Sequence, residues 1–321
     1  MKRVFVAGTI LVDRIHTIDA YPRSGELAQI RSVGRTPGGL VPNVGIDLRV
    51  FAPDVPVSAC GAVGPDEDGV FVRDEMFRRG IDVSRVVVSK ECSTSFTDVM
   101  SVAGGERTFF TYAGACGEWG YEDFPFDAVK TGDIVLLGYF LLLAKIDAGD
   151  GLRILQELKR RGAETAIDLV TEHSDRYKLV RECLPYVDHL IVNEHEAARI
   201  AGVEVETTEL EDLARALKDA GAPGNIIVHS PAARVFMESD GTIVKRPSVR
   251  LPRGFVKDKT GAGDAFCAGV LTGLSRGASS MTSLELASIA AVGALSAEGA
   301  TSGMKNEKEL RKLCLSLSIR S

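Results

Sequence analysis

The sequence has few cysteines, one tryptophan and no excess of basic residues, and these shortages exclude several classes of protein. Its six cysteines among 321 residues include no CxxC pair, so neither a disulfide framework nor a zinc site is indicated. The 44 acidic residues outnumber the 38 basic ones, which gives a net charge of −6. A general nucleic-acid binder needs a basic face to neutralise phosphates, so we expect no nucleic-acid partner.

Long apolar runs are also absent. The nearest candidate, residues 134–144, is shorter than the ~18 apolar residues that a membrane helix requires. Near the N-terminus, Asp13 interrupts a short apolar run and no small-residue cleavage site follows it, so a secretory signal is not indicated. We therefore expect a cytoplasmic protein with no membrane partner.

Short apolar runs alternate with amphipathic segments along the chain. Runs of strand length begin at Val4, Ile134, Ala166, Leu190 and Ile226, and helical patterns such as 150–161 and 209–220 lie between them. This alternation is typical of βαβ units, which build a mainly parallel sheet with helices on both faces. The sequence therefore predicts an α/β fold.

Residues 93–113 break that rhythm. Two β-rich runs, 96–102 and 107–113, flank Ala103-Gly104-Gly105-Glu106, which has the residue types of a hairpin turn. With the segment around 14–36, this hairpin predicts a small sheet outside the main one, although an ordinary meander at the sheet edge fits the spacing equally well. Arg107, directly after the turn, either reaches a ligand from this hairpin or is a solvated turn residue.

Glycine is abundant, with 33 residues, and the most informative glycines lie at 258–266 in the run DKTGAGDAF. Gly261 and Gly263 allow tight backbone conformations and leave room for a ligand. The amides of Ala262, Gly263 and Asp264 then open a helical pattern, where unpaired N–H groups and the helix dipole favour an anion. Beside such an anion, Asp264 is placed to accept a proton from a hydroxyl nucleophile. From the motif alone, a simple helix cap is the competing interpretation.

Other phosphate and catalytic motifs are missing. The chain contains no GxxxxGK[ST], no GxGxxG after its first strand and no GxSxG. A P-loop, a dinucleotide-binding fold and an α/β-hydrolase are therefore not supported.

Four ordered elements resemble the ribokinase-like (PfkB-type) carbohydrate kinase family. The run DKTGAGDAFCAG at 258–269 is similar to the family's C-terminal signature, and 37–43 contains its GGxxxN element. Residues 61–69 resemble its GxxGxDxxG stretch, and 193–196 fit its NxxE element. The resemblance spans residues 4 to about 300.

The resemblance implies a ribokinase-like three-layer α/β fold, formed by one domain over residues 1–321, with a central, mainly parallel sheet. It also implies a small β-sheet lid, made from segments near 14–36 and 93–113, which in some members clasps a second lid in a homodimer. The reaction would be transfer of the ATP γ-phosphoryl group to an alcohol of a sugar or sugar-like substrate. A nucleoside kinase of the same family is an alternative, and so is a non-catalytic relative that binds a sugar or nucleotide.

The resemblance also assigns roles to residues. Asp264 matches the catalytic base, and the amides of Gly261, Ala262 and Gly263 match the anion hole. The positions that match the substrate site are Asp13, Gly38, Gly39 and Asn43, with Arg107 reaching it from the lid.

For the cofactors, Asn193 and Glu196 match positions that organise Mg²⁺ and the nucleotide phosphates, largely through water. Asp258 and Thr260 match positions that support a monovalent cation such as K⁺ in some members.

The sequence departs from the family pattern after the apolar run that ends at Val228. The family usually has Thr-x-Gly and a further glycine there, which line the nucleotide, whereas this chain has His229-Ser230-Pro231-Ala232-Ala233-Arg234. Pro231 offers no N–H and has a fixed φ, and Ser230 is the nucleotide-binding candidate that remains. A second departure follows Asp168, where an Asn and an Arg are usual. Arg176 is the nearest arginine, at a different spacing.

Overall fold

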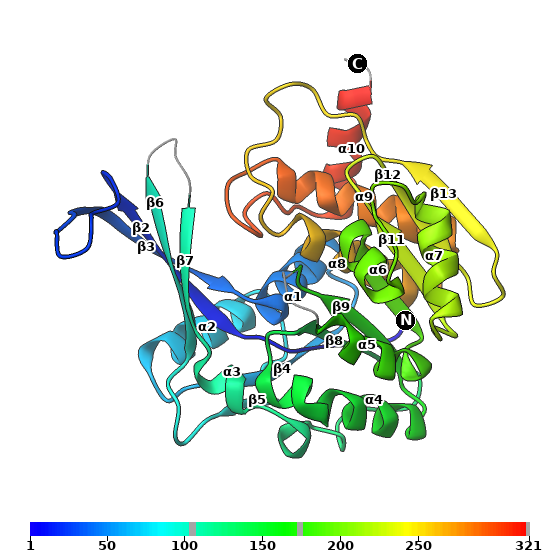
Figure 1. The fold of residues 1–321 in the computed structure, drawn as a ribbon, viewed down its shortest axis with the longest axis horizontal. Helices are drawn as coiled ribbons and strands as arrows, with labels where there is room; N and C mark the ends of the chain where they lie inside the picture. Colours follow the sequence, from blue (N-terminus) through cyan, green and yellow to red (C-terminus); the bar gives the residue numbers. More distant parts are fainter. Residues whose placement is uncertain (103–106, 172–175, 319–321) are drawn as a thin grey trace.

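The large sheet is the framework of the molecule (Figure 1). The computed structural model describes residues 1–102, 107–171 and 176–318. Within them, nine strands pair in the order β13-β12-β11-β10-β9-β8-β1-β4-β5. All neighbours are parallel except β11–β12 and β12–β13, which are antiparallel. The strands are β1 Val4–Ala7, β4 Val57–Val63, β5 Val86–Val88, β8 Ile134–Phe140, β9 Glu164–Leu169, β10 His189–Asn193, β11 Asn225–His229, β12 Ala233–Met237 and β13 Ile243–Pro247.

Helices cover both faces of this sheet and give the protein three layers. Alternate residues of each strand enter opposite cores: Phe5 of β1 packs with one set of helices and Val6 with the other. The first core includes α3 Gly114–Glu118, α4 Gly151–Arg160, α5 Tyr177–Cys183, α6 Glu194–Ala201 and α7 Leu210–Asp219. The second includes α1 Leu40–Phe51, α2 Glu67–Arg78, α8 Ala262–Ser275, α9 Ser280–Leu295 and α10 Glu307–Ser318. A parallel sheet buried on both faces explains why its strands read as continuous apolar runs.

A separate small sheet projects from the body of the molecule (Figure 1). Its strands are β2 Leu11–Ile18, β3 Ile30–Gly38, β6 Ser95–Val102 and β7 Arg107–Tyr112, in the order β3-β2-β6-β7. The hairpin expected from the sequence corresponds to β6 and β7, which pair antiparallel. Its expected turn, Ala103-Gly104-Gly105-Glu106, lies outside the described residues.

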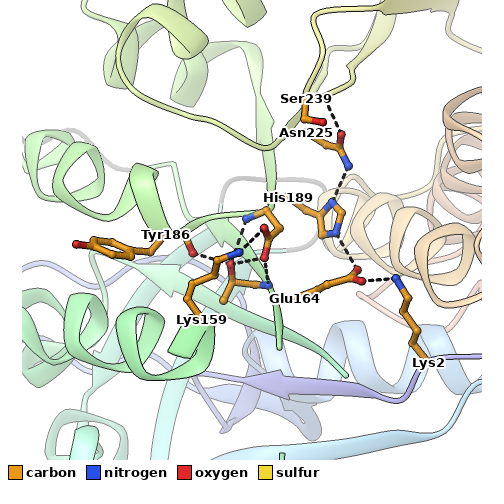
Figure 2. Close-up of polar contacts among 9 residues, drawn as sticks. Lys2, Lys159, Glu164, Tyr186, His189, Asn225 and Ser239 are labelled. Carbon is orange, nitrogen blue, oxygen red and sulfur yellow. Dashed lines mark hydrogen bonds and ion pairs between the residues drawn. The ribbon is translucent and has the colours of Figure 1, made fainter. Parts of the chain in front are cut away.

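Polar side chains join the amino ends of β9, β10 and β11 (Figure 2). His189 lies between the Glu164 carboxylate, at 3.4 Å, and the Asn225 side-chain amide, at 3.1 Å. Asn225 Oδ1 in turn accepts a hydrogen bond from the Ser239 backbone N–H at 3.0 Å, and Glu164 also binds Lys2. We call these residues the amino-end network. It ties three neighbouring strands together at the edge of the sheet where each strand begins.

No helix in the described ranges is both long enough and apolar enough to cross a membrane.

Candidate active site

The carboxyl ends of the same three strands carry polar residues that face a cavity. Asp168 lies near the end of β9, and Asn193 and His229 are the last residues of β10 and β11, where they are paired in register. All three line a cavity of about 180 Å³ together with Glu196 and Asp264. Ligands of open α/β sheets bind outside the carboxyl ends of the strands. This cavity is therefore the candidate active site.

The start of α8 forms one wall of the cavity. Gly261 precedes the helix in the left-handed conformation, with φ +75°, which is unfavourable for a residue with a side chain. A Cβ on Gly261 would also lie 2.5 Å from the Ala300 carbonyl oxygen, whereas a Cβ on Gly263 would meet nothing within 4 Å. The Ala262 N–H donates to the Lys259 carbonyl at 3.2 Å. The backbone at Gly263 therefore has open space beside it at the positive end of a helix.

Asp264 is buried in the first turn of α8 and is linked to α1. Its Oδ2 accepts a hydrogen bond of 2.9 Å from Asn43 Nδ2, and its side chain is 6% exposed. One turn further along α1, Asp47 is completely buried, and neither of its carboxyl oxygens has a hydrogen-bond partner among the described residues. Burial, reinforced by the Asp264 charge, raises the pKa of Asp47 well above its ordinary value.

Asp13 lies near the same region, on β2 of the small sheet. Gly38, at the end of β3, lies so close to Asp13 that a Cβ there would be 2.3 Å from Asp13 Oδ2. The turn after Gly38 is fixed by Thr9, whose Oγ1 accepts from the Leu40 N–H at 3.0 Å. A Cβ on Gly39 would lie 2.7 Å from the Thr9 carbonyl oxygen. These close contacts place the β2 carboxylate beside the start of the helix that carries Asn43.

Three further carboxyl groups of this region, besides Asp47, have elevated pKa values because they are removed from water. Burial raises the pKa of Asp13 to about 6. Burial also raises the pKa of Asp168 well above its usual range, and the charges of Glu196 and Asp264 add to the effect. The pKa of Glu196 is raised by burial as well. Acids that repel one another in a cavity favour a site for a cation or for a donated proton.

Asn193 and Glu196 form a capping box at the start of α6. Asn193 Oδ1 accepts from the N–H of Glu196 at 3.0 Å, and Glu196 Oε2 accepts from the N–H of Asn193 at 3.0 Å. Thr171 donates to Glu196 Oε1 and accepts from Asn193 Nδ2, each at 2.8 Å. The sequence signal at 193–196 therefore has a structural role as well as a place in the cavity wall.

Asp258 accepts hydrogen bonds on both carboxyl oxygens. Oδ1 accepts from the N–H and the hydroxyl of Thr260, at 3.0 and 2.9 Å. Oδ2 accepts from the Gly299 N–H at 3.3 Å and from Arg107 Nη1 at 3.2 Å. Although burial acts to raise it, these donors hold the pKa of Asp258 at about 2. Arg107, on β7, thus connects the small sheet to the segment that precedes Asp264.

A second, larger cavity of about 490 Å³ adjoins the first, and the two share Asn193, His229 and Gly263 as lining residues. Its remaining wall is mostly apolar, formed by α8, α9 and the segment 248–259. Ser230 lines it, but the Ser230 hydroxyl also accepts from the N–H groups of Ala232 and Ala233, at 3.2 and 3.1 Å. The loop that departs from the family pattern is therefore a tight turn between the end of β11 and the start of β12.

The structure brings together most of the residues singled out from the sequence. Asp264 and the glycine run contact one cavity, Asn43 bonds to Asp264, and Asp13 lies against Gly38. Arg176 is engaged elsewhere, donating to the Leu141 carbonyl at 2.6 Å and to Asp147 at 3.2 Å.

Sequence reasoning did not assign site roles to Asp47, Asp168, His229 or Arg234. A signal for Asp47 was present, because it follows Asn43 by four residues and so shares its helix face. For Arg234, its place in the segment 229–234 that departs from the family pattern was visible, but its burial was not.

Comparisons with known proteins agree with this arrangement. The model of the pfkB family of carbohydrate kinases matches residues 1–307. Among curated proteins, the chain is 24% identical to a ribokinase of Lactococcus lactis, over 99% of each chain. It is also 26% identical to adenosine kinase 1 of Arabidopsis thaliana, over 80% of this chain and 77% of that one.

Solved structures share the fold over nearly the whole length. The Arabidopsis thaliana ribokinase complexed with ribose and ATP superposes with a TM-score of 0.83 at 21% identity, covering 98% of this chain and 99% of that one. A ribokinase from Thermotoga maritima gives a TM-score of 0.81 at 18% identity, over 98% and 100%. The three-layer ribokinase-like fold with a small additional sheet, expected from the sequence, is thereby confirmed.

Proposed function

The chain belongs to the pfkB family of carbohydrate kinases, which are phosphotransferases with an alcohol group as acceptor, and on this premise we propose a specific reaction. The chain transfers the γ-phosphoryl group of ATP to a hydroxyl of a sugar, a sugar-like molecule or a nucleoside. ATP as donor is supported by the related ribokinase that was solved with ribose and ATP. Both acceptor classes are represented among the relatives, as ribokinases and as adenosine and nucleoside kinases.

The hydrogen bond between Asn43 and Asp264 carries the proposal. It joins the helix that follows Gly38 and Gly39 to the helix that begins at the glycine run. A carboxylate held in this way, at a helix N-terminus and beside a cavity, is placed to act as a general base. In the proposed reaction, Asp264 accepts the proton of the acceptor hydroxyl as the oxygen attacks the γ-phosphorus, and the bond to the β-phosphate oxygen breaks.

The glycine run supplies the proposed anion hole. The N–H groups of Gly261, Ala262 and Gly263 open α8, whose dipole favours the negative charge of the phosphoryl group. The open space beside Gly263 leaves room for that group. Ala262 has to release the Lys259 carbonyl if its N–H is to contribute. Positioning and charge stabilisation of this kind provide most of the catalysis in phosphoryl transfer.

We propose that the small sheet, built from segments near 14–36 and 93–113, is a lid over the acceptor site. The lid and the large sheet belong to a single domain over residues 1–321. In register, Asp13 of β2 lies beside Thr36 of β3 and Thr97 of β6, so these side chains share one face. That face includes Arg107, which binds Asp258. The face is therefore turned toward the segment that precedes Asp264. Short polar groups there suit an acceptor that presents several hydroxyls.

The acidic cavity fits Mg²⁺. Carboxylate oxygens are its preferred protein ligands, and it usually keeps several waters and binds substrate phosphates. Glu196 and Asn193 would hold it from one wall, largely through water, because no three His, Cys, Asp or Glu side chains of the described residues are arranged to hold a metal ion directly. When bound, the ion neutralises charge on the transferring phosphate.

The surroundings of Asp258 and Thr260 fit K⁺ less well. Both oxygens of Asp258 already accept hydrogen bonds, and Arg107 supplies a positive charge beside them. A monovalent cation at these two residues is therefore not part of the proposed reaction.

A homodimer through the small sheet is part of the proposal. β7 is an edge strand of that sheet, and all six of its residues are exposed. An unpaired strand edge is a template for pairing with another chain. Sedimentation velocity on the wild-type protein tests this arrangement, and a single monomeric species at all concentrations contradicts it.

The test of the proposed function is a screen of ATP consumption over sugars, sugar acids and nucleosides, with Mg²⁺ and with or without K⁺. We expect one acceptor class to stimulate consumption, with a phosphorylated product detectable by mass spectrometry. Binding of an acceptor and a nucleotide without any turnover would instead support a non-catalytic relative and overturn the kinase proposal.

A further inference from the structure

An arginine without a partner is buried in the wall of the larger cavity. Arg234 is the second residue of β12, directly opposite His229 in the antiparallel ladder, and it is 9% exposed. Within the described part of the chain its side chain forms no hydrogen bond or ion pair, and its Nε is buried without an acceptor. Burial, together with the nearby charge of Arg246, lowers the pKa of Arg234 to about 10, so the guanidinium remains charged at neutral pH.

No acidic side chain among the described residues pairs with this charge, and burial raises the pKa of the nearby Cys314 thiol. His229 stacks on Phe266, with ring centroids 4.4 Å apart, and burial lowers its pKa to about 4. Glu194, an acidic residue of the same cavity wall, lies within ion-pair distance of His195 and not of Arg234. A buried donor that lacks an acceptor is costly. An acceptor brought by a ligand would remove that cost.

The position of Arg234 indicates which part of a nucleotide it meets. The smaller cavity, with Asp264 and the start of α8, is the end that takes the transferred phosphate. Arg234 does not line that cavity; it lines only the larger one, alongside apolar side chains such as Leu251, Val292 and Leu295. A flat apolar ring fits among such side chains, so Arg234 lies at the end of the site that holds the base.

The chemistry of the guanidinium then discriminates between purines. Arginine offers only donors. The N7 edge of adenine pairs an acceptor with the N6 amino donor, whereas a 6-oxopurine presents two adjacent acceptors, O6 and N7, which one arginine binds bidentately. We propose that Arg234 makes this donor site select 6-oxopurine nucleotides, guanosine or inosine triphosphate, over ATP. The proposal rests on the proposed function and narrows it: ATP is accepted, but as the weaker donor.

Equilibrium binding tests this selectivity without requiring the acceptor. Titration calorimetry of the wild-type protein with GDP, IDP and ADP, each with Mg²⁺, should show GDP and IDP binding about 5- to 150-fold more tightly than ADP, the range of discrimination of a bidentate arginine–purine pair. IDP lacks the guanine amino group, so similar constants for IDP and GDP attribute the preference to O6 and N7. ADP binding as tightly as IDP would overturn the proposal.

Substitutions at Arg234 separate a base contact from a phosphate contact. Glutamine can pair with N6 and N7 of adenine, so Arg234→Gln should shift the preference toward ADP. Arg234→Lys keeps the charge but not the planar fork, and it should reduce the preference without reversing it. Arg246→Gln is the matched control, because Arg246 is the exposed cross-strand neighbour of Arg234. In this variant the ratio of the dissociation constants for ADP and GDP should stay at the wild-type value.

The possible failures are distinguishable. If Arg234→Gln weakens the binding of GDP, IDP and ADP by the same factor, Arg234 contacts phosphate or supports the fold. The proposed base selectivity is then wrong, while the kinase proposal stands. If the wild-type protein binds no nucleotide at all, the proposed function itself is wrong. Once an acceptor is known, the ratio of kcat/KM for ITP and ATP should follow the ratio of the binding constants.

Discussion

The two ends of strands β9, β10 and β11 are built from similar residue types but are organised in opposite ways. The amino ends carry Glu164, His189 and Asn225, and the carboxyl ends carry Asp168, Asn193 and His229. At the amino ends each polar side chain finds a partner within the protein (Figure 2). At the carboxyl ends Asn193 is satisfied by its capping box, but in the surrounding site Asp47 on α1, Asn43 Oδ1 on α1 and Arg234 Nε on β12 have no partner in the described residues.

The contrast in partners is also a contrast in electrostatics. Hydrogen bonding to His189, with the Lys2 charge, lowers the pKa of Glu164 to about 2. Burial instead raises the pKa of Asp13, Asp47 and Asp168. Acids whose charge is satisfied stabilise the fold, whereas acids held without partners are a cost that a substrate, cation or proton can offset. The amino-end network is accordingly expected to affect stability, and the carboxyl ends to affect activity.

The largest effect is expected for Asp264→Asn. The amide keeps the size of the side chain but cannot accept a proton in the reaction, so kcat should fall by ~10²-fold or more, while ATP binding and the melting temperature stay near wild type. Steady-state kinetics with the acceptor found in the screen and a thermal melt provide the two readouts. A variant with near wild-type turnover would remove Asp264 from the role of base.

Asp47→Asn tests whether the unpartnered acid at this end is a stability cost. A raised pKa means that the folded state holds a proton which the unfolded state loses above about pH 3.8, so stability falls as pH rises, by up to about 1.4 kcal/mol per pH unit. The variant should lack this slope in urea-unfolding measurements made between pH 4 and 7. Parallel curves for the two proteins would show that Asp47 does not titrate in this way.

Asp13→Asn is expected to act on the acceptor rather than on turnover. A hydrogen bond to a charged group contributes about 1.5–3 kcal/mol, so KM for the acceptor should rise by about tenfold or more. Because the pKa of Asp13 is about 6, the wild-type KM should increase as pH falls below 6 and the carboxylate is protonated. The variant should show no such inflection in KM. If its KM keeps the wild-type pH dependence, the inflection belongs to another group.

Phe109→Ala and Phe110→Ala form a matched pair on β7. The two rings are 61% and 58% exposed, but alternation along the strand places Phe109 on the face of Asp13 and Phe110 on the opposite face. If the small sheet is a lid, Phe109→Ala should raise acceptor KM by about fivefold, the equivalent of ~1 kcal/mol, and Phe110→Ala should not. Equal effects would indicate that the sheet is an edge without a lid function.

Much of this arrangement could be predicted from the sequence because it depends on local patterns. Alternating apolar runs placed β1, β8, β9, β10 and β11, and the glycine run placed the start of α8 and Asp264. The pairing of Asn43 with Asp264 joins residues far apart in the chain, so the sequence alone could suggest it only through the family resemblance.

Other features depend on burial, which no local pattern reveals. Arg234 stood out only as part of the segment 229–234 that departs from the family pattern, yet it lines a cavity because β12 turns back antiparallel along β11. Arg107 looked like a substrate or solvent contact, yet it binds Asp258, which lies in a segment 151 residues away. Both follow from which segments become neighbours in the folded chain.

The smallest effect is expected at the amino-end network, and Glu164→Gln measures it. Glu164 has a pKa lowered from 4.5 to about 2 by His189 and Lys2, so its contribution is complete above pH 4.5 and is lost as pH falls toward 2. The variant should therefore be less stable than wild type at pH 7, and the difference should shrink below pH 4.5, opposite in sign to the slope expected from Asp47. Because the network lies at the far end of the strands from Asp264, kcat and acceptor KM should be unchanged. A loss of activity in a fully folded Glu164→Gln protein would break the division between the two ends of the sheet.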